Sequence, residues 1–425
     1  MVILTRNIDL RRWKKLGDWK LVYGRRKTGK TFFVKNFTEW DEYFFVRRDG
    51  VVIDEDGKML TYDTFFEIFK RILGKERVVV DEFHRLPPEF LDFLHYTGEK
   101  GELILISSML WSINKLFKLG SPILGLFSEF RFSLVDERDA IISLLKHLKG
   151  KDLIEASTYL REPWLASKFR KPVREFLASV FHESRLTVPR LIGEIFREEE
   201  RELSVVYESI MRAISDGKNK TTEIADVLYS RKVIPKNDPG YLHTYLKNLV
   251  NMGLMEKVPV VNARKFHYNH SSPVFDAYCY LDEKYTFSEV EISEEQVKKV
   301  VDELIPKHVE QFFRNLLAKL FGLQKGVIIT KEFDVDIALT DFKQIKVVAE
   351  VKWKNTVKRN EISKIEDNLS KFDARRILIV PREDVLERMP ENTEVWDVER
   401  VVQEVTKAES DAQFTSQCKS RLPPL

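Results

Sequence analysis

The segment that most constrains the fold of this 425-residue chain lies near its N-terminus. A strand-like run at residues 20–23 leads into Gly24, four further residues, Gly29, Lys30 and Thr31, and an amphipathic stretch follows. This order is typical of a phosphate-binding loop, in which successive backbone N–H groups face phosphates at a helix N-terminus. The segment therefore predicts an α/β fold with a parallel sheet and a nucleotide site at the edge of that sheet.

The polar groups of this loop have expected roles. We expect Lys30 to contact the β- and γ-phosphates of the nucleotide and Thr31 to give its hydroxyl to Mg²⁺. The loop that would surround the phosphates comprises Gly24, Arg25, Arg26, Lys27, Thr28, Gly29, Lys30, Thr31 and Phe32. A chance glycine turn would match the pattern in about one chain in a hundred of this size, so a nucleotide site is the favoured interpretation.

A second apolar run, residues 77–80, ends in two carboxylates, Asp81 and Glu82. Downstream of a phosphate-binding loop, we expect Asp81 to hold the magnesium ion through water, and Glu82 to orient and deprotonate the attacking water. The alternative is a buried strand that merely ends in exposed acids, which is common where no such loop precedes it. Together the two motifs predict Mg²⁺-dependent nucleotide hydrolysis.

A third apolar run, residues 103–106, ends in Ser107 and Ser108. Ser107 stands where many ATPases keep a polar residue that senses the γ-phosphate, although a strand can equally end in two serines without this role. No Asn-Lys-x-Asp sequence that would read guanine follows. ATP is therefore the expected nucleotide, with Mg²⁺ as its cofactor.

Composition argues against several classes of protein. The two cysteines, Cys279 and Cys418, are too few and too far apart for a disulfide framework or a zinc module. No apolar run approaches the ~20 residues that span a bilayer, so we expect a cytoplasmic protein without a membrane partner. The net charge of only +3 gives no argument for nucleic acid by itself, so any such argument needs local patches.

The order of periodic segments predicts several domains. Apolar runs that alternate with amphipathic stretches indicate a sheet with crossover helices, and we predict its strands at 20–23, 42–46, 77–80, 103–107 and 129–134. From Asp136 onward the apolar spacing becomes helical. The predicted units are an ATPase core at 1–135, a helical lid at 136–202, a winged helix at 203–284, a mixed α/β domain at 285–407 and an unstructured tail at 408–425.

In the predicted winged helix, Asp238 and Pro239 form a favourable helix start, and the helix would run to Gly253. The residues expected to face the core are Leu242, Leu246, Leu249 and Val250. Those expected to be exposed, where they could enter a major groove, are His243, Thr244, Lys247, Asn248 and Asn251. The hairpin at 254–268 would form the wing and offer phosphates the cations Lys257, Arg264 and Lys265. Alternatively, the unit packs on the nucleotide module without touching DNA.

A third set of charged residues lies in the predicted C-terminal α/β domain. On a strand at 347–353 the side chains alternate, so Glu350 and Lys352 share one face, and Asp336 lies on the preceding strand of the same hairpin. Two carboxylates could hold Mg²⁺, and Lys352 could stabilise or activate the water that hydrolyses a phosphodiester. Glu310, on an upstream helix, is a candidate fourth member. The alternative is a half-buried hairpin with ordinary surface charge.

These motifs together resemble the archaeal ATPase family of the AAA+/STAND class. The resemblance rests on Tyr23-Gly24-Arg25-Arg26, Val80-Asp81-Glu82-Phe83, Ser121-Pro122, Val335-Asp336-Ile337 and Ala349-Glu350-Val351-Lys352-Trp353. It implies a P-loop module followed by a helical lid, a winged helix and a C-terminal domain similar to restriction endonucleases, with the Asp-then-Glu-x-Lys nuclease pattern.

The chain departs from this family pattern at two places. Relatives carry Ser-Pro-Leu-Tyr-Gly-Arg, whereas residues 121–126 here end in Gly125 and Leu126. The arginine, a possible sensor or finger, is therefore missing, and Arg131 or a neighbouring subunit could replace it. The Gly-Gly-x-Pro turn of the lid is replaced by Leu-Arg-Glu-Pro at residues 160–163, which implies a different lid geometry.

Two functions are compatible with these features. One is an ATP-dependent enzyme that associates with double-stranded DNA and cuts it at Asp336, Glu350 and Lys352. The other is a nucleotide-switched regulator that binds DNA or protein and cuts nothing. A homo-oligomer is compatible with both, since a neighbouring subunit can supply a missing finger arginine.

Overall fold

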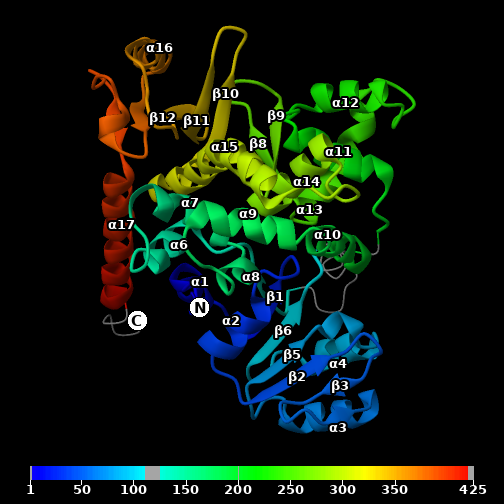
Figure 1. The fold of residues 1–425 in the computed structure, drawn as a ribbon. Helices are drawn as coiled ribbons and strands as arrows, with labels where there is room; N and C mark the ends of the chain where they lie inside the picture. The colour runs from blue at the N-terminus through cyan, green and yellow to red at the C-terminus, as the bar shows by residue number, and fades with distance from the viewer. Residues whose placement is uncertain (1, 111–124, 200, 420–425) are drawn as a thin grey trace.

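The computed structural model describes residues 2–110, 125–199 and 201–419, with the side chains of 412–419 excepted. Two α/β layers lie at opposite ends of the molecule, and a central group of helices separates them (Figure 1). The N-terminal sheet contains the predicted phosphate-binding loop, and the C-terminal sheet contains the Asp336–Glu350 hairpin. The division of the chain into the predicted domains stays a prediction.

The N-terminal sheet has the order β4-β3-β2-β5-β6-β1-β7. The neighbours β2, β5, β6, β1 and β7 pair in parallel, and β3 and β4 add in antiparallel. Its strands are β1 (Trp19–Tyr23), β2 (Glu42–Val46), β3 (Val52–Ile53), β4 (Met59–Leu60), β5 (Val78–Asp81), β6 (Leu103–Ser107) and β7 (Ser128–Arg131). All five predicted strands are confirmed, although β7 ends at Arg131 rather than at residue 134.

Helices cover both faces of this sheet, which explains why its central strands are apolar on both sides. They are α1 (Asn7–Trp13), α2 (Lys30–Phe37), α3 (Tyr62–Ile72) and α4 (Glu89–Thr97), and the short turn η1 (Phe83–Arg85) follows β5. Because consecutive parallel strands point the same way, the C-terminal ends of β1, β5 and β6 meet at one edge. The predicted nucleotide residues are at this edge.

The middle of the chain is helical, as expected from Asp136 onward. The lid segment contains α6 (Glu137–Leu144), α7 (Gly150–Leu160), α8 (Pro163–Ala166), α9 (Val173–Glu183) and α10 (Thr187–Glu198). The expected winged helix contains α11 (Val205–Ser215), α12 (Thr221–Ser230), η2 (Pro239–Leu242), α13 (His243–Asn251), β8 (Met255–Pro259), β9 (Phe266–His270) and α14 (Pro273–Tyr285). The prediction that Asn248 is exposed is wrong, because its side chain is buried and donates to the Tyr207 hydroxyl at 2.7 Å.

The C-terminal layer follows the long helix α15 (Glu294–Phe321) and has the strand order β10-β11-β12-β13-β14. Its elements are β10 (Gln324–Ile329), β11 (Asp334–Asp341), β12 (Gln344–Val351), α16 (Arg359–Ser370), β13 (Arg375–Ile379), η3 (Glu383–Val385), β14 (Glu394–Trp396) and α17 (Val398–Lys419). The first three strands are antiparallel, and β13 and β14 add in parallel.

The predicted loss of structure after Ala408 is wrong as far as Lys419, because α17 continues through this segment. Arg11 of α1 holds the helix with two hydrogen bonds to the carboxylate of Glu409, one of them at 2.8 Å. Residues 420–425 lie outside the described part. None of the helices in the described ranges is long and apolar enough to cross a membrane.

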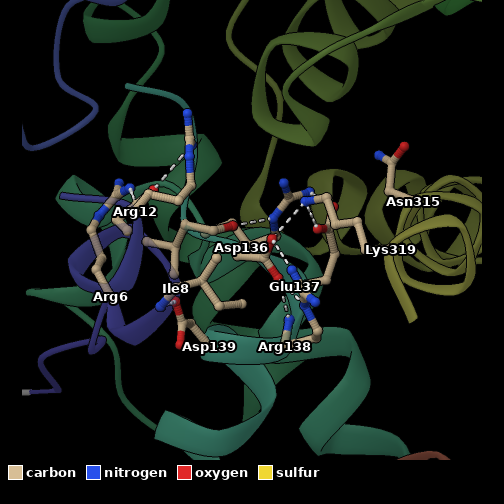
Figure 2. A network of polar contacts seen from close by, with 12 residues as sticks. Arg6, Ile8, Arg12, Asp136, Glu137, Arg138, Asp139, Asn315 and Lys319 are labelled. Carbon is tan, nitrogen blue, oxygen red and sulfur yellow. Dashed lines mark hydrogen bonds and ion pairs between the residues drawn. The ribbon is translucent and has the colours of Figure 1, made fainter. Parts of the chain in front are cut away.

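A network of buried charges joins the N-terminal layer to α15, and Figure 2 shows α6 acids facing Lys319 of α15. Glu137 is fully buried and pairs with Arg161 at 2.7 Å and with Lys319. In the same first turn of α6, Asp139 accepts a 3.1 Å hydrogen bond from the backbone N–H of Ile8. Burial, with nearby acids such as Asp136, raises the pKa of Asp139 to about 7.

This raised pKa predicts a pH-dependent stability. Between the ordinary value of 3.8 and about 7, the folded chain keeps a proton on Asp139 that the unfolded chain has released. The free energy of unfolding therefore falls as pH rises through this window, by about 1.4 kcal/mol for each pH unit. Asp139→Asn keeps the acceptor for Ile8 and cannot ionise. In urea unfolding, the stability of Asp139→Asn relative to that of wild type should increase from pH 5 to pH 8.

The matched control for this measurement is Asp367→Asn, which changes an exposed carboxylate on α16. Its difference from wild type should be the same at both pH values. An equally flat difference for Asp139→Asn would contradict the assignment of the buried proton to this side chain.

Candidate nucleotide site

The loop between β1 and α2 has the backbone that the glycine pattern predicts. A Cβ on Gly24 would lie 2.1 Å from the carbonyl oxygen of Phe132, so only glycine fits this close approach. Gly29 has a φ of +93°, a left-handed conformation that side chains disfavour, and it precedes the first residue of α2, Lys30. The loop therefore opens directly onto the N-terminus of α2.

Lys30 lies inside this loop. Its ammonium group donates to the carbonyl oxygens of Gly24 at 2.7 Å and of Arg25 at 3.1 Å. Burial lowers the pKa of Lys30 to about 8, although Glu82 and Asp81 oppose the change. A buried ammonium held only by backbone carbonyls is a strong donor for phosphate oxygens.

Thr31 and Asp81 meet as predicted, with the threonine hydroxyl donating to Oδ2 of Asp81 at 2.7 Å. Tyr43, at β2, donates to the same oxygen at 2.5 Å, a contact that the sequence did not suggest. Burial raises the pKa of Asp81, and its other oxygen, Oδ1, is buried without a hydrogen-bond partner. This unpartnered carboxylate oxygen next to Thr31 fits a role in holding Mg²⁺.

Glu82 turns toward the same edge because its backbone is left-handed, with a φ of 59°, which is uncommon for a residue other than glycine. Its Oε2 accepts from the backbone N–H of Ser108 at 3.3 Å and from the Ser108 hydroxyl at 3.0 Å. Arg85 approaches the same oxygen at 3.8 Å. The carboxylate is thus held in one orientation beside Lys30 and Thr31, with which it lines a common cavity.

The prediction for Ser107 needs correction. Its side chain is fully buried, where it hydrogen-bonds Nδ1 of His84 at 3.0 Å and accepts from the backbone N–H of Met109 at 3.1 Å. The cavity is lined instead by Ser108, the next residue, which contacts Glu82. A strand that ends in two serines places them on opposite sides, and only the sheet determines which one faces the cavity.

The cavity at this edge has a volume of about 950 Å³. Of the predicted loop residues, those that line it are Arg26, Lys27, Gly29, Lys30, Thr31 and Phe32. Its other wall comes from residues that were not expected at the nucleotide site, including Leu4, Val135, Pro163 and Trp164. These apolar side chains come from the N-terminal segment, the chain after β7 and α8, and no motif connects them.

Arg25 and Thr28 of the predicted loop direct their side chains to protein groups. Arg25 forms a 2.6 Å ion pair with Glu162 in which both side chains are buried, and it lies over the ring of Phe275. The Thr28 hydroxyl donates to the carbonyl of Arg25 at 2.8 Å. These two side chains therefore hold the loop, and any contact to phosphate would come from their backbone.

Arg26 lines the cavity but is also paired. Its Nε lies 2.9 Å from Glu194, and its Nη1 donates to Glu198, both on α10. Burial lowers the pKa of Arg26, but the negative charges of Glu198 and Glu194 act in the opposite direction and outweigh burial. The pKa of Arg26 is therefore raised.

The arginine of the family pattern, which this chain lacks, is not replaced at the cavity by Arg131, because Arg131 is exposed on β7 and does not line the cavity. The Ser121-Pro122 stretch lies outside the described residues, and Leu126 packs against the sheet. Arg85 is the arginine that stands next to Glu82 at the cavity wall. No motif singles out Arg85, which follows Glu82 by three residues in the short turn η1.

In the C-terminal layer, β11 and β12 form the predicted hairpin, with Ile337 opposite Ala349. Asp336 Oδ2 accepts from the backbone N–H of Val351 at 2.9 Å, and Lys352 lies 2.7 Å from Glu350 and 4.0 Å from Asp336. The three residues that the sequence analysis grouped are therefore together.

The electrostatics of this cluster are strongly coupled. Burial and the charge of Asp336 raise the pKa of Glu350 to about 8 and that of Glu310 to about 7. Glu310 contacts the cluster from α15, where it pairs with Arg314, whose Nε donates to the carbonyl of Asp336 at 2.9 Å. Across the described ranges, no group of three or more His, Cys, Asp or Glu side chains is arranged to hold a metal. A cation here would rely on Asp336 and Glu350.

The expected wing is attached to the C-terminal layer. The backbone N–H of Val261 donates to the carbonyl of Val327 at 2.8 Å, and Val258, Val260 and Val327 share a small core. The wing cations Lys257, Arg264 and Lys265 are exposed, as predicted. Lys257 lies over the ring of Phe266 at 3.6 Å.

No protein-family model matches the chain, and no curated protein matches it. Among solved structures, the ORC2 protein of Aeropyrum pernix in ADPNP–ADP complexes is 15% identical, with 71% of this chain and 91% of that chain covered and a TM-score of 0.35. The ORC1 protein of the same organism in complex with DNA is 14% identical, with 68% and 95% covered and a TM-score of 0.30.

A signal-transduction ATPase with numerous domains and a tetratricopeptide repeat sensor, from Pyrococcus horikoshii, is 15% identical. The match covers 75% of this chain and 53% of that chain, with a TM-score of 0.27. At these values the likeness is distant.

The close approach at Gly24 predicts a sharp cost for the smallest substitution. Gly24→Ala places a methyl group against the backbone of Phe132 and should lower the free energy of unfolding by about 1–3 kcal/mol. Gly193→Ala is the matched control, since its Cβ meets nothing within 4 Å and it lies in α10. Alanine there should be neutral or stabilising by up to about 1 kcal/mol. Equal effects of the two changes in urea unfolding would contradict the tight packing of the loop.

Proposed function

We propose that this protein binds ATP with Mg²⁺ and hydrolyses it at the edge formed by β1, β5 and β6. The observation that carries the proposal is the convergence of Lys30 and Thr31 with Asp81 and Glu82, from two segments far apart in the sequence, onto one cavity edge. Chance placement would not bring a buried ammonium, a hydroxyl and two carboxylates together at a helix N-terminus.

Each group has a role in this reaction. Lys30 and the backbone N–H groups at the start of α2 bind the phosphates, and Thr31 with Asp81 holds the magnesium ion. Magnesium supplies charge neutralisation of the phosphates when it is bound. Glu82, held by Ser108, orients the attacking water and accepts its proton, while the apolar wall around Trp164 shields the site from bulk water.

Two substitutions separate binding from turnover. Lys30→Ala should abolish tight ATP binding, because it removes the cation that faces the phosphates. Glu82→Gln should retain ATP binding and lower the turnover rate by about 10²–10⁴-fold, because the amide cannot accept the proton. Titration with a fluorescent ATP analogue and a phosphate-release assay measure the two steps. Lys14→Ala, an exposed lysine, is the control for charge alone, and wild-type ATP affinity in Lys30→Ala would refute the site.

A second candidate function is metal-dependent phosphodiester cleavage by the C-terminal layer. The observation that favours it is the assembly of Asp336, Glu350 and Lys352 at one end of the β11–β12 hairpin, next to Glu310. Asp336 and Glu350 would hold the cation, and Lys352 would stabilise the charge that develops on the phosphate. The exposed wing cations suit a role in binding double-stranded DNA. The switch without cleavage stays an alternative.

The C-terminal site can be tested directly. Asp336→Asn removes one of the two carboxylates and should abolish nicking of double-stranded DNA in Mg²⁺ or Mn²⁺, while ATP turnover is unchanged. Asp334→Asn, an exposed carboxylate on the same strand, is the matched control. Agarose gels report cleavage. Intact DNA with wild-type protein would leave the regulator as the better account, and cleavage that persists in Asp336→Asn would place it elsewhere or in a contaminant.

A further inference from the structure

Helix α7 and the turn that follows it carry several buried polar side chains, and those of Glu155, Tyr159 and Glu162 reach other segments of the chain. Glu155 and Tyr159, four residues apart, lie on one side of α7, and Glu162 lies in the turn just beyond its last residue, Leu160. Each contacts a different part of the chain. In Figure 1, α7 lies between α15 and the N-terminal layer.

At one end, Glu162 holds the phosphate-binding loop. Its 2.6 Å ion pair with Arg25 is buried on both sides. The carbonyl oxygen of Arg25 also accepts from Lys30 at 3.1 Å, so the residue that Glu162 holds is bonded to the lysine that faces the cavity. A change in the position of Lys30 or of the loop therefore acts on Glu162.

At the other end, Glu155 holds the segment that contains Lys352. Glu155 is fully buried and accepts a 3.0 Å hydrogen bond from the indole N–H of Trp353. It is fixed by Arg174, which donates two hydrogen bonds at 2.9 and 2.7 Å. The indole of Trp353 is therefore held by the lid. Because Trp353 directly follows Lys352, this contact also restrains the chain next to Lys352.

Between these ends, Tyr159 joins α7 to α15. Its hydroxyl lies 2.6 Å from Nδ1 of His308, whose Nε2 lies 2.7 Å from Asp276 of α14. His308 precedes Glu310 of the C-terminal cluster by two residues on α15. The helix is therefore fixed at three points, and all three contacts are withdrawn from water.

We propose that α7 is a rigid link that couples nucleotide binding at Lys30 to the placement of Lys352 and its neighbours in the C-terminal cluster. The inference rests on the proposed ATP site. Buried charged contacts are costly to break singly, so a displacement of Arg25 moves α7 instead of being absorbed locally. Coupling between two sites is reciprocal, so a change at Trp353 must alter the affinity for ATP.

The first test uses this reciprocity and needs no nuclease activity. Trp353→Phe removes the indole donor to Glu155 and keeps an aromatic ring beside Phe313. It should change the Kd for a fluorescent ATP analogue by about 2- to 30-fold, a common range for mutations that connect two sites. Trp396→Phe is the matched control, because this indole is also buried but donates its hydrogen bond to Glu394 of its own strand instead of to a residue of α7.

The outcomes of this titration are distinct. Wild-type protein that binds no ATP would overturn the proposed function itself, and the link with it. ATP affinity in Trp353→Phe equal to that of wild type and of Trp396→Phe would overturn the link alone. If Trp353→Phe does not fold, Tyr159→Phe removes a different buried contact of the same helix and is measured in its place.

The second test follows the opposite direction by hydrogen exchange at saturating ATP and Mg²⁺. In wild type, ATP should change the exchange of residues 347–358, which surround Lys352, as well as that of the phosphate-binding loop. In Glu162→Gln the change at the loop should persist and the change at 347–358 should vanish. Asp152→Asn, an exposed carboxylate on α7, should behave as wild type. A change at 347–358 that survives in Glu162→Gln would overturn the link.

Discussion

The structure depends on the parallel pairing of β5, β6 and β1. Parallel strands end at the same edge, so residues that are 50 positions apart in the sequence, Thr31 and Asp81, come within 2.7 Å of each other. The pairing also explains why these strands are buried and mainly apolar, since helices cover both faces of such a sheet. Without it, the glycine loop would be an ordinary turn and the two carboxylates an ordinary strand end.

Buried ion pairs determine how the lid helices are placed against the segments around them. Glu137, Glu155 and Glu162 are each fully buried, and each is paired with an arginine or lysine from another segment. Such pairs add little net stability compared with apolar packing, but removing one partner leaves a charge without water. They therefore specify one arrangement of the lid against its neighbours.

The site residues that the sequence predicted correctly are those whose role follows from a motif of a few neighbouring residues. Gly24, Lys30, Thr31, Asp81 and Glu82 each follow from a local pattern, and the structure brings them together. Ser107 was chosen over Ser108 because adjacent residues cannot be told apart without the sheet. Arg25 was expected at the phosphates, but its partner Glu162 is 137 residues away and invisible to any local pattern. The same holds for Asn248, whose partner Tyr207 lies on another helix.

The sequence by itself determined the main strands of the N-terminal sheet and the helical middle of the chain, because periodicity, glycine positions and apolar runs act over a few residues. It determined that the predicted β11–β12 hairpin places Asp336 near Glu350, since strands joined by a short turn pair locally. The tertiary structure alone decided which side chains form the cavity wall and how the wing joins β10 through Val261 and Val327. It also decided that α7 and the turn after it contact both Trp353 and the phosphate-binding loop. These depend on contacts between distant segments, whose geometry follows from the packing of the whole chain rather than from any one stretch of it.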